Sequence, residues 1–362
     1  MKTLALAAAA LVALPAAAEP DAPAARWYEK SQLFGYAKAG YFFVTPAADD
    51  ALLGARDGFR MINLRVGLSL KPADQLEVVA SVDGAQPRRD AADPLAGSRV
   101  VELKDAYLEW TPSRFAGLRI GQFKAPLDAE ELLPDAQLPF ITRSVVSDGA
   151  VPPDAYPVEG LSLSRQVGLQ VASERLGSDT AGFRYAVAVV NGNGANVLNN
   201  DNNLVTPVAR VSYEYQDLVT VSANAAYDAR LEGVRPNRLP SSRLSYGGDV
   251  SVRAGGIDLL GVVLMRNTTH PGSGLPSESA LGWLAQAHYL HKESGLEGGV
   301  RFASYEPSSV VPDDRVMEGA AMVAYTLKSA PLRLLLQYTL RLEEAAVAVS
   351  NDSVDVMGQV SW

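Results

Sequence analysis

Hydrophobic and polar residues alternate along most of this chain with a period of two. From Ile62 to Leu70 every even position is apolar, and the odd positions between them are polar or small. The segments 332–343 and 353–362 repeat the alternation. A period of two places the two sets of side chains on opposite faces of a β-strand. The pattern therefore predicts an all-β protein whose strands each have one apolar face.

About 16 such runs follow one another, and many have the ~9–11 residues that a tilted strand needs to cross a membrane. One of them, 257–267, is apolar on both faces, so its orientation stays open. The connectors alternate between short ones, such as 71–75 and 112–116, and long ones, such as 46–57 and 124–161. Transmembrane β-barrels have short periplasmic turns and longer outer loops.

The pattern predicts a closed, antiparallel transmembrane β-barrel over residues 33–362. Closure removes the exposed edges that an open sheet of this length would leave. A soluble periplasmic sandwich or propeller is the alternative for an alternating chain. Such folds usually have shorter strands, and no blade-length repeat is visible here.

The first residues predict export. Lys2 precedes an apolar run from Leu4 to Leu14, and three alanines before Glu19 form a small-residue cleavage site. We therefore expect a signal peptide over 1–18, followed by a short periplasmic segment over 19–32. Together with the barrel, this predicts the outer membrane of a Gram-negative bacterium. Trp362 ends the last alternating run and suits an aromatic girdle at the membrane interface.

Composition narrows the function. The chain has no cysteine, and 41 acidic residues outnumber 32 basic ones, which argues against nucleic acid as a partner. Nothing in the sequence predicts a cofactor. The expected partners are outer-membrane lipid and small ions in transit.

The longest connector, 124–161, contains Leu132, Leu138, Phe140 and Ile141. It is too apolar for a freely solvated loop, and a loop of this length needs a packing site or a function. Sixteen strands would enclose a lumen too wide for side chains to fill. We therefore expect this third long loop to fold into the lumen and narrow the pore.

Alternate residues of each strand face the barrel interior, which should therefore receive basic and acidic side chains in nearly equal numbers. This alternation alone predicts no strong ion selectivity. The opposite charges would either face the solute or pair with one another. The expected inward bases include Lys38, Arg65, Arg119, Arg301 and Arg333.

Enzyme signals are weak. Some outer-membrane barrels are lipases with a serine–histidine pair, and His288 is the candidate histidine for an alternative of phospholipase type. A plugged structural barrel is the other alternative. Neither a Gly-x-Ser-x-Gly motif nor a metal-binding histidine spacing is present, so we expect no catalysis.

Several motifs resemble the phosphate-selective porin O and P family. They are "LKDAYLEW" (103–110), "LRIGQFKAPLDAEEL" (118–132), "FITRS" (140–144) and "YAVAVVNGNG" (185–194). The resemblance implies a 16-stranded homotrimeric porin whose third loop forms the constriction. It also implies that the basic residues at matching positions, Lys124 and Arg143, contact the anion.

This chain departs from the family at Thr142, where an acid is usual. Its third loop also carries Asp128, Glu130, Glu131 and Asp135. Two bases against four acids argue against a strongly phosphate-selective constriction. The sequence therefore predicts a porin for passive diffusion of small hydrophilic solutes, weakly anion-preferring, with phosphate or polyphosphate as candidates. The predicted site combines Lys124, Arg143 and the inward bases with Glu130, Glu131 and Asp135.

Overall fold

The computed structural model describes residues 30–45, 57–89, 97–150, 158–197, 199–200, 202–233, 236–344 and 351–362. The predicted signal peptide over 1–18, and residues 19–29 of the predicted periplasmic segment, lie outside these residues. The first strand begins at Ser31, two residues before the predicted start of the barrel at 33. None of the helices in the described residues is long and apolar enough to cross a membrane.

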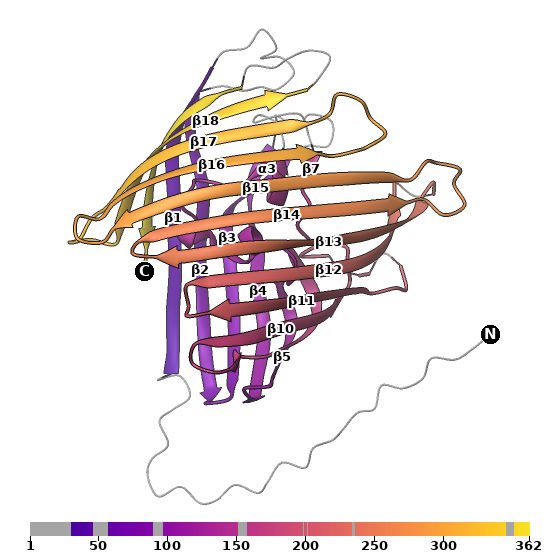
Figure 1. Ribbon diagram of the computed structural model, residues 1–362, viewed down its shortest axis with the longest axis horizontal. Coiled ribbons are helices and arrows are strands. Elements are labelled where there is room, and N and C mark those ends of the chain that lie inside the picture. Colours follow the sequence, from indigo (N-terminus) through magenta and orange to yellow (C-terminus); the bar gives the residue numbers. More distant parts are fainter. Residues whose placement is uncertain are drawn as a thin grey trace, which may run out of the picture.

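The described residues form one antiparallel sheet that closes on itself (Figure 1). It has 17 strands, of which the two-residue β9 (Leu176–Gly177) pairs with β10 beside β8, so the barrel wall has 16. The wall strands are β1 (Ser31–Val44), β2 (Gly58–Ala73), β3 (Leu76–Arg89), β4 (Gly97–Ser113), β5 (Ala116–Lys124), β8 (Arg165–Ala172), β10 (Ala181–Val190), β11 (Thr206–Tyr215), β12 (Val219–Glu232), β13 (Leu239–Ala254), β14 (Ile257–Thr269), β15 (Glu278–His291), β16 (Leu296–Glu306), β17 (Val316–Thr326), β18 (Leu332–Glu343) and β19 (Ser353–Ser361). The predicted all-β barrel of about 16 strands is confirmed.

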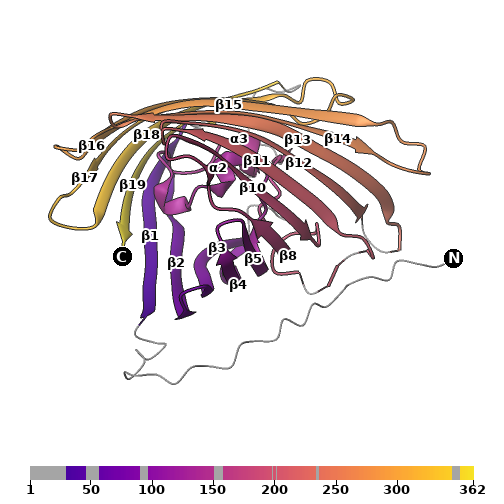
Figure 2. The ribbon, with the colours of Figure 1, turned by 60° about the horizontal axis from the view of Figure 1, so that its bottom comes forward.

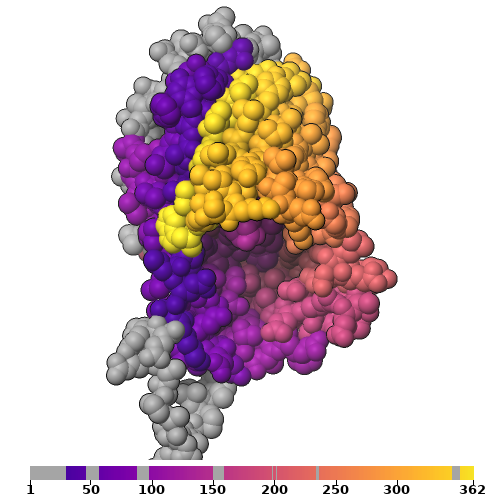
Figure 3. Space-filling model, turned by 90° about the vertical axis from the view of Figure 1, so that its left-hand side faces the viewer, coloured from indigo at the N-terminus to yellow at the C-terminus, as the bar shows by residue number. Residues whose placement is uncertain are grey.

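The first and last strands close the barrel. β1 pairs with β19 from Tyr36–Ser361 to Val44–Ser353, and Gly35 and Trp362 exchange two backbone hydrogen bonds of 3.0 Å. Strands β1–β5 run across the direction of β11–β17 in Figure 1, because strands on opposite walls of a tilted barrel cross in projection. The barrel is hollow at the end where the C-terminal strand finishes (Figure 3).

The alternation sorts the side chains as predicted. On β2, Leu64, Val66 and Leu68 are exposed on the outer surface, whereas Arg65 is buried inside. On β19, Val354 and Val356 point outward and Asp355 is buried. A charged side chain on the apolar outer surface would cost free energy. The polar positions of these strands therefore face the lumen, as the alternating sequence predicted.

The strand 257–267, which the sequence left without an orientation, is now oriented. Ile257, Leu259 and Val263 are exposed on the outside of β14. Leu260 and Val262 are buried on the inside, in one cluster with residues of the third loop. Both faces are apolar because one faces outward and the other packs against the loop.

Substitution of Leu264 tests the packing between β14 and the third loop. It is buried on the inner face of β14 with Val146 and Leu161 of the third loop. Because Leu264→Ala leaves a cavity there, we expect the free energy of unfolding to fall by about 2–4 kcal/mol. Denaturant titration of the protein in lipid vesicles measures this change. The control is Leu259→Ala on the outer face of the same strand, and an equal loss in both variants would contradict the assignment.

Candidate functional site

The third loop runs from Ala125 to Ser164, between β5 and β8, close to the predicted span of 124–161. It contains α2 (Ala129–Leu132), the 3₁₀ helix η2 (Asp135–Gln137), α3 (Val145–Asp148) and the short paired strands β6 (Gly149–Ala150) and β7 (Val158–Glu159). Figure 2 shows α2 and α3 inside the curve of the barrel wall.

Hydrogen bonds from distant strands hold the loop to the inner wall. Arg333 of β18 donates to the carbonyl oxygens of Leu138 at 3.1 Å and Pro139 at 2.8 Å. Gln359 of β19 donates to the Ala136 carbonyl oxygen at 2.9 Å. These contacts satisfy loop carbonyl groups that burial would otherwise leave without partners.

Glu130 anchors the beginning and the end of the loop's helical part. Asp128 caps α2 by accepting from the Glu130 backbone N–H at 3.0 Å. The Glu130 carboxylate accepts from the Ser144 hydroxyl at 2.6 Å and from the Ser147 hydroxyl at 2.7 Å. It also pairs with Arg301 of β16 at 3.3 Å. The buried carboxylate therefore joins α2, α3 and the wall.

Asp135 is the second anchor. Its carboxylate pairs with Arg65 at 2.9 Å and with Arg143, and it accepts from the Tyr36 hydroxyl at 3.0 Å. Lys38 donates to the Asp135 carbonyl oxygen at 2.5 Å. Burial alone would raise the pKa of Asp135, but the guanidinium groups of Arg143 and Arg65 outweigh it and hold the pKa well below its usual range.

Lys124 and Arg143, the two bases that the family resemblance assigned to the anion, contact the loop itself. Lys124 donates to the carbonyl oxygens of Glu131 at 2.5 Å and Leu133 at 2.7 Å. Arg143 pairs with Glu131 at 3.0 Å and donates to the Leu133 carbonyl oxygen at 2.7 Å. Both side chains therefore stabilise the loop's turn.

The structure brings together nine of the ten predicted site residues, through the loop and the wall around it. They are Lys38, Arg65, Lys124, Glu130, Glu131, Asp135, Arg143, Arg301 and Arg333. Arg119 lies apart, paired with Glu109 at 2.6 Å and stacked on the Tyr107 ring at 4.4 Å. Most of the nine are buried. A buried charge is tolerated only when it is paired, and here the pairing fixes the loop to the wall.

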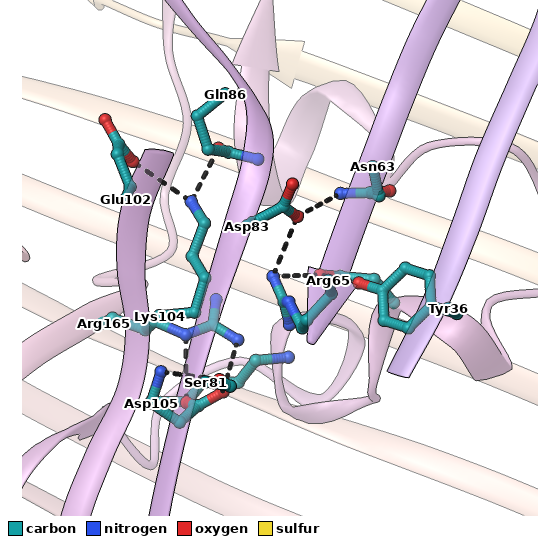
Figure 4. A network of polar contacts seen from close by, with 12 residues as sticks. Tyr36, Asn63, Arg65, Ser81, Asp83, Gln86, Glu102, Lys104, Asp105 and Arg165 are labelled. Carbon is teal, nitrogen blue, oxygen red and sulfur yellow. Dashed lines mark hydrogen bonds and ion pairs between the residues drawn. The ribbon is translucent and has the colours of Figure 1, made fainter. Parts of the chain in front are cut away.

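Sequence reasoning missed Arg165, the first residue of β8. It makes two hydrogen bonds to Asp105 of β4, at 3.0 and 3.1 Å (Figure 4). It also lies 4.0 Å from Glu131. In the same view Arg65 lies 3.6 Å from Asp83, which accepts from Asn63 at 2.9 Å. Arg165 directly follows the long loop in sequence, and that position is the signal that could have identified it.

A cavity of about 670 Å³ opens beside this network, next to the C-terminal residue Trp362. Its walls include apolar and aromatic side chains, among them Phe34, Val79 and Tyr185. Its charged lining is mostly basic. The bases are Arg65, Arg119, Lys124, Arg165, Arg184 and Arg210, and the acids are Asp105 and Asp135.

Three of these bases are more exposed than their acidic partners. Arg184 is 52% exposed, whereas Glu214, 2.7 Å away, is 16% exposed. Arg210 and Lys124 are likewise more exposed than Asp249 and Glu131. Arg119 and Glu109 are equally exposed, and Asp105 is more exposed than Arg165. Arg184 and Arg119 are the most exposed bases of the lining.

A smaller cavity, of about 280 Å³, lies toward the long connectors. Arg230, Arg243 and Arg266 line it from three neighbouring strands, together with Glu159 of the third loop. The sequence analysis did not identify this group. Arg266 lies in the strand 257–267, whose orientation the sequence left open.

His288 faces the lumen beside two carboxylates. Its ring nitrogens lie 3.2 Å from Glu297 and 3.8 Å from Asp258. A serine-histidine mechanism needs one ring nitrogen to face a serine hydroxyl, and here both nitrogens face carboxylates.

One buried loop carboxyl predicts a pH dependence. Burial, reinforced by Glu130, raises the pKa of Asp128 to about 7. The unfolded chain loses this proton near pH 4, so stability falls as the pH rises from about 4 to about 7. We expect the melting temperature in detergent to drop by roughly 2–5 °C between pH 5 and pH 8.

Asp128→Asn should reduce that drop, because the amide keeps a cap acceptor for the Glu130 N–H and cannot ionise. Melting curves of both proteins at the two pH values test this. The same drop in the wild type and in the variant would contradict the role given to Asp128.

Comparisons with known proteins support the architecture. No protein-family model matches the chain, and a search of curated proteins finds no match. Among solved structures, it is similar to an anion-selective porin from Comamonas acidovorans, with a TM-score of 0.62 and 12% identity over 92% of this chain and 99% of that one. It is also similar to the outer-membrane channel DcaP of Acinetobacter baumannii, with a TM-score of 0.61 and 14% identity over 92% and 97% of the two chains.

A third similar structure is the trimer form of OmpT, an outer-membrane protein of Vibrio cholerae, with a TM-score of 0.56 and 11% identity over 92% and 99% of the two chains. Identities at this level establish the fold. The chain therefore has the 16-stranded β-barrel fold of the outer-membrane porins.

Proposed function

We propose that this protein is an outer-membrane porin that lets small hydrophilic solutes diffuse passively and prefers anions. The observation that carries the proposal is the mostly basic lining of the 670 Å³ cavity, in which six basic residues face two acidic ones. The similar anion-selective porin supports it. The proposal includes export by a cleaved signal peptide, residence in a Gram-negative outer membrane and assembly as a homotrimer.

The preference for anions follows from exposure more than from net charge. Buried acids such as Glu131 and Asp249 are shielded behind the bases that they pair with. Exposed guanidinium groups such as Arg184 remain able to attract an anion and release it again. Weak attraction of this kind is compatible with rapid passage.

Phosphate is a candidate solute, because planar guanidinium groups suit its oxygens. In this chain Lys124 and Arg143 are engaged by the loop's own carbonyl and carboxylate groups. We therefore assign the first contacts with an anion to Arg119 and Arg184. The third loop acts as the constriction.

A plugged structural barrel is the second candidate, because apolar contacts also hold the loop in place. Phe140 and Ile141 pack with Met322 and Leu335 of the wall. A phospholipase is not proposed, because both ring nitrogens of His288 face carboxylates and neither faces a serine hydroxyl.

Reconstitution in a planar lipid bilayer distinguishes the two candidates. A porin gives stepwise, ohmic conductance increments from folded protein. A plugged barrel gives folded protein without such steps, and that result would overturn the proposed function.

A further inference from the structure

Three arginines converge on one carboxylate at the long-connector end of the lumen. The Glu159 carboxylate lies 3.1 Å from Arg243, 3.6 Å from Arg230 and 3.9 Å from Arg266. The three bases come from β13, β12 and β14, and Glu159 comes from β7 of the third loop. Three guanidinium groups thus lie within 4 Å of the Glu159 carboxylate.

The backbone at Glu159 is held by hydrogen bonds, whereas its side chain is largely exposed. The Tyr305 hydroxyl donates to the Glu159 carbonyl oxygen at 2.5 Å, and Arg266 donates to the Gly160 carbonyl oxygen at 3.2 Å. The Glu159 side chain is nevertheless 58% exposed, unlike the buried Glu130 and Glu131. Rotation about its side-chain bonds can therefore withdraw the carboxylate without moving the loop.

The arginines have unused capacity to donate hydrogen bonds. Arg243 donates to both Glu159 oxygens, at 3.1 and 3.2 Å, through one nitrogen, Nη1. Its Nε is buried without a hydrogen-bond partner. Arg230 and Arg266 approach the carboxylate only as charges, beyond 3.5 Å.

The other acids near the cluster have their own partners. Asp228 pairs with Arg230 and accepts from the Thr206 hydroxyl at 2.8 Å. Glu232 pairs with the other terminal nitrogen of Arg243 at 2.6 Å and accepts from the Ser241 hydroxyl at 2.8 Å. If the Glu159 carboxylate moves away, the three arginines therefore keep only two acidic partners, and one positive charge is left without a counterion.

Space for a small solute adjoins the cluster. The 280 Å³ cavity is lined by Glu159 and the three arginines, and also by the polar side chains of Gln166, Asn193 and Ser245.

We propose that this cluster is a carboxylate-binding site in which Glu159 occupies the place of a solute's carboxylate group. A small carboxylate that enters the barrel displaces the Glu159 side chain and pairs with Arg230, Arg243 and Arg266. The proposal rests on the proposed porin function and names a solute class and a site for it.

The exchange replaces one carboxylate by another, so the arginines stay paired throughout. A tethered competitor acts at an effective concentration in the millimolar range. Glu159 therefore keeps solute binding weak and quickly reversible, which conduction requires. Removing its charge should tighten binding.

Succinate is the probe, and block of the chloride current through single channels in a planar bilayer is the readout. We expect Glu159→Gln to lower the half-blocking succinate concentration by about tenfold, because the tethered competitor is neutralised. Adding Arg243→Gln to Glu159→Gln should reverse that gain. The matched control is Glu344→Gln, an exposed acid paired with Arg315 at 3.4 Å outside the cluster, which should leave the block unchanged.

Channels that conduct but show the same succinate block in the wild type and in Glu159→Gln would overturn the site alone. An equal shift in Glu344→Gln would also overturn it, because the effect would then be one of general charge. If the protein forms no channels, the proposed function fails, and the melting temperature in detergent tests the site instead. Succinate should then stabilise Glu159→Gln more than the wild type, and equal stabilisation would overturn the site.

Discussion

Replacing Asp135 by alanine should release the third loop and raise the single-channel conductance severalfold. The substitution removes the carboxylate that pairs with Arg65 and Arg143 and accepts from the Tyr36 hydroxyl. Arg65 and Arg143 would lose a buried counterion, at a cost of about 3–5 kcal/mol. Moving the loop from the wall relieves that cost, because it brings the arginines into water.

Single-channel recording and limited proteolysis of the folded protein measure this effect. We expect larger and noisier conductance steps together with new cleavage between residues 125 and 164. The matched control is Asp74→Ala, which removes an exposed ion pair with Lys30 in a turn and should change neither result. A conductance of wild-type size and an uncut loop in Asp135→Ala would refute the role of this carboxylate.

The second large effect concerns ion preference. We expect the double substitution Arg119→Gln and Arg184→Gln to lower the chloride-to-potassium permeability ratio by about threefold or more, because it removes two guanidinium groups from the cavity lining. Their partners Glu109 and Glu214 would remain. The charge around the cavity would then be less basic.

Reversal potentials in a salt gradient give this ratio. The matched control is Arg253→Gln, an exposed base paired with Asp258 that does not line the cavity, and it should leave the ratio nearly unchanged. An unchanged ratio in the double variant would show that anion preference arises elsewhere in the pore.

The barrel could be predicted from the sequence because alternation is a local property. Each strand of a barrel places one face outward and the other inward, so residues such as Val66 and Arg65 reveal sidedness without knowledge of their partners. The strand 257–267 was the exception. Its inner face, with Val262 and Leu264, packs against the third loop, and that contact is invisible in the local pattern.

The residues of the candidate site could be predicted from the sequence, but their contacts could not. The alternation of each strand predicts that Arg301 and Arg333 face the lumen, and the structure agrees. Their partners in the third loop, Glu130 and the Leu138 carbonyl group, lie 171 and 195 residues away along the chain. Periodicity gives no information on contacts of that kind.

The same limit explains why the Glu159 cluster was missed. Arg230, Arg243 and Arg266 meet because β12, β13 and β14 pair in a particular register, and Glu159 reaches them only because the loop folds inward. Local alternation gave no register between the strands and no path for the loop.

Whether this barrel is an open pore that prefers anions can be read from the reversal potential of the wild-type channel, measured in a planar bilayer between a concentrated and a dilute potassium chloride solution. We predict a potential with the sign set by chloride moving down its gradient more readily than potassium. A potential of the opposite sign would rule out the preference for anions, and folded protein without conductance steps would rule out the open pore.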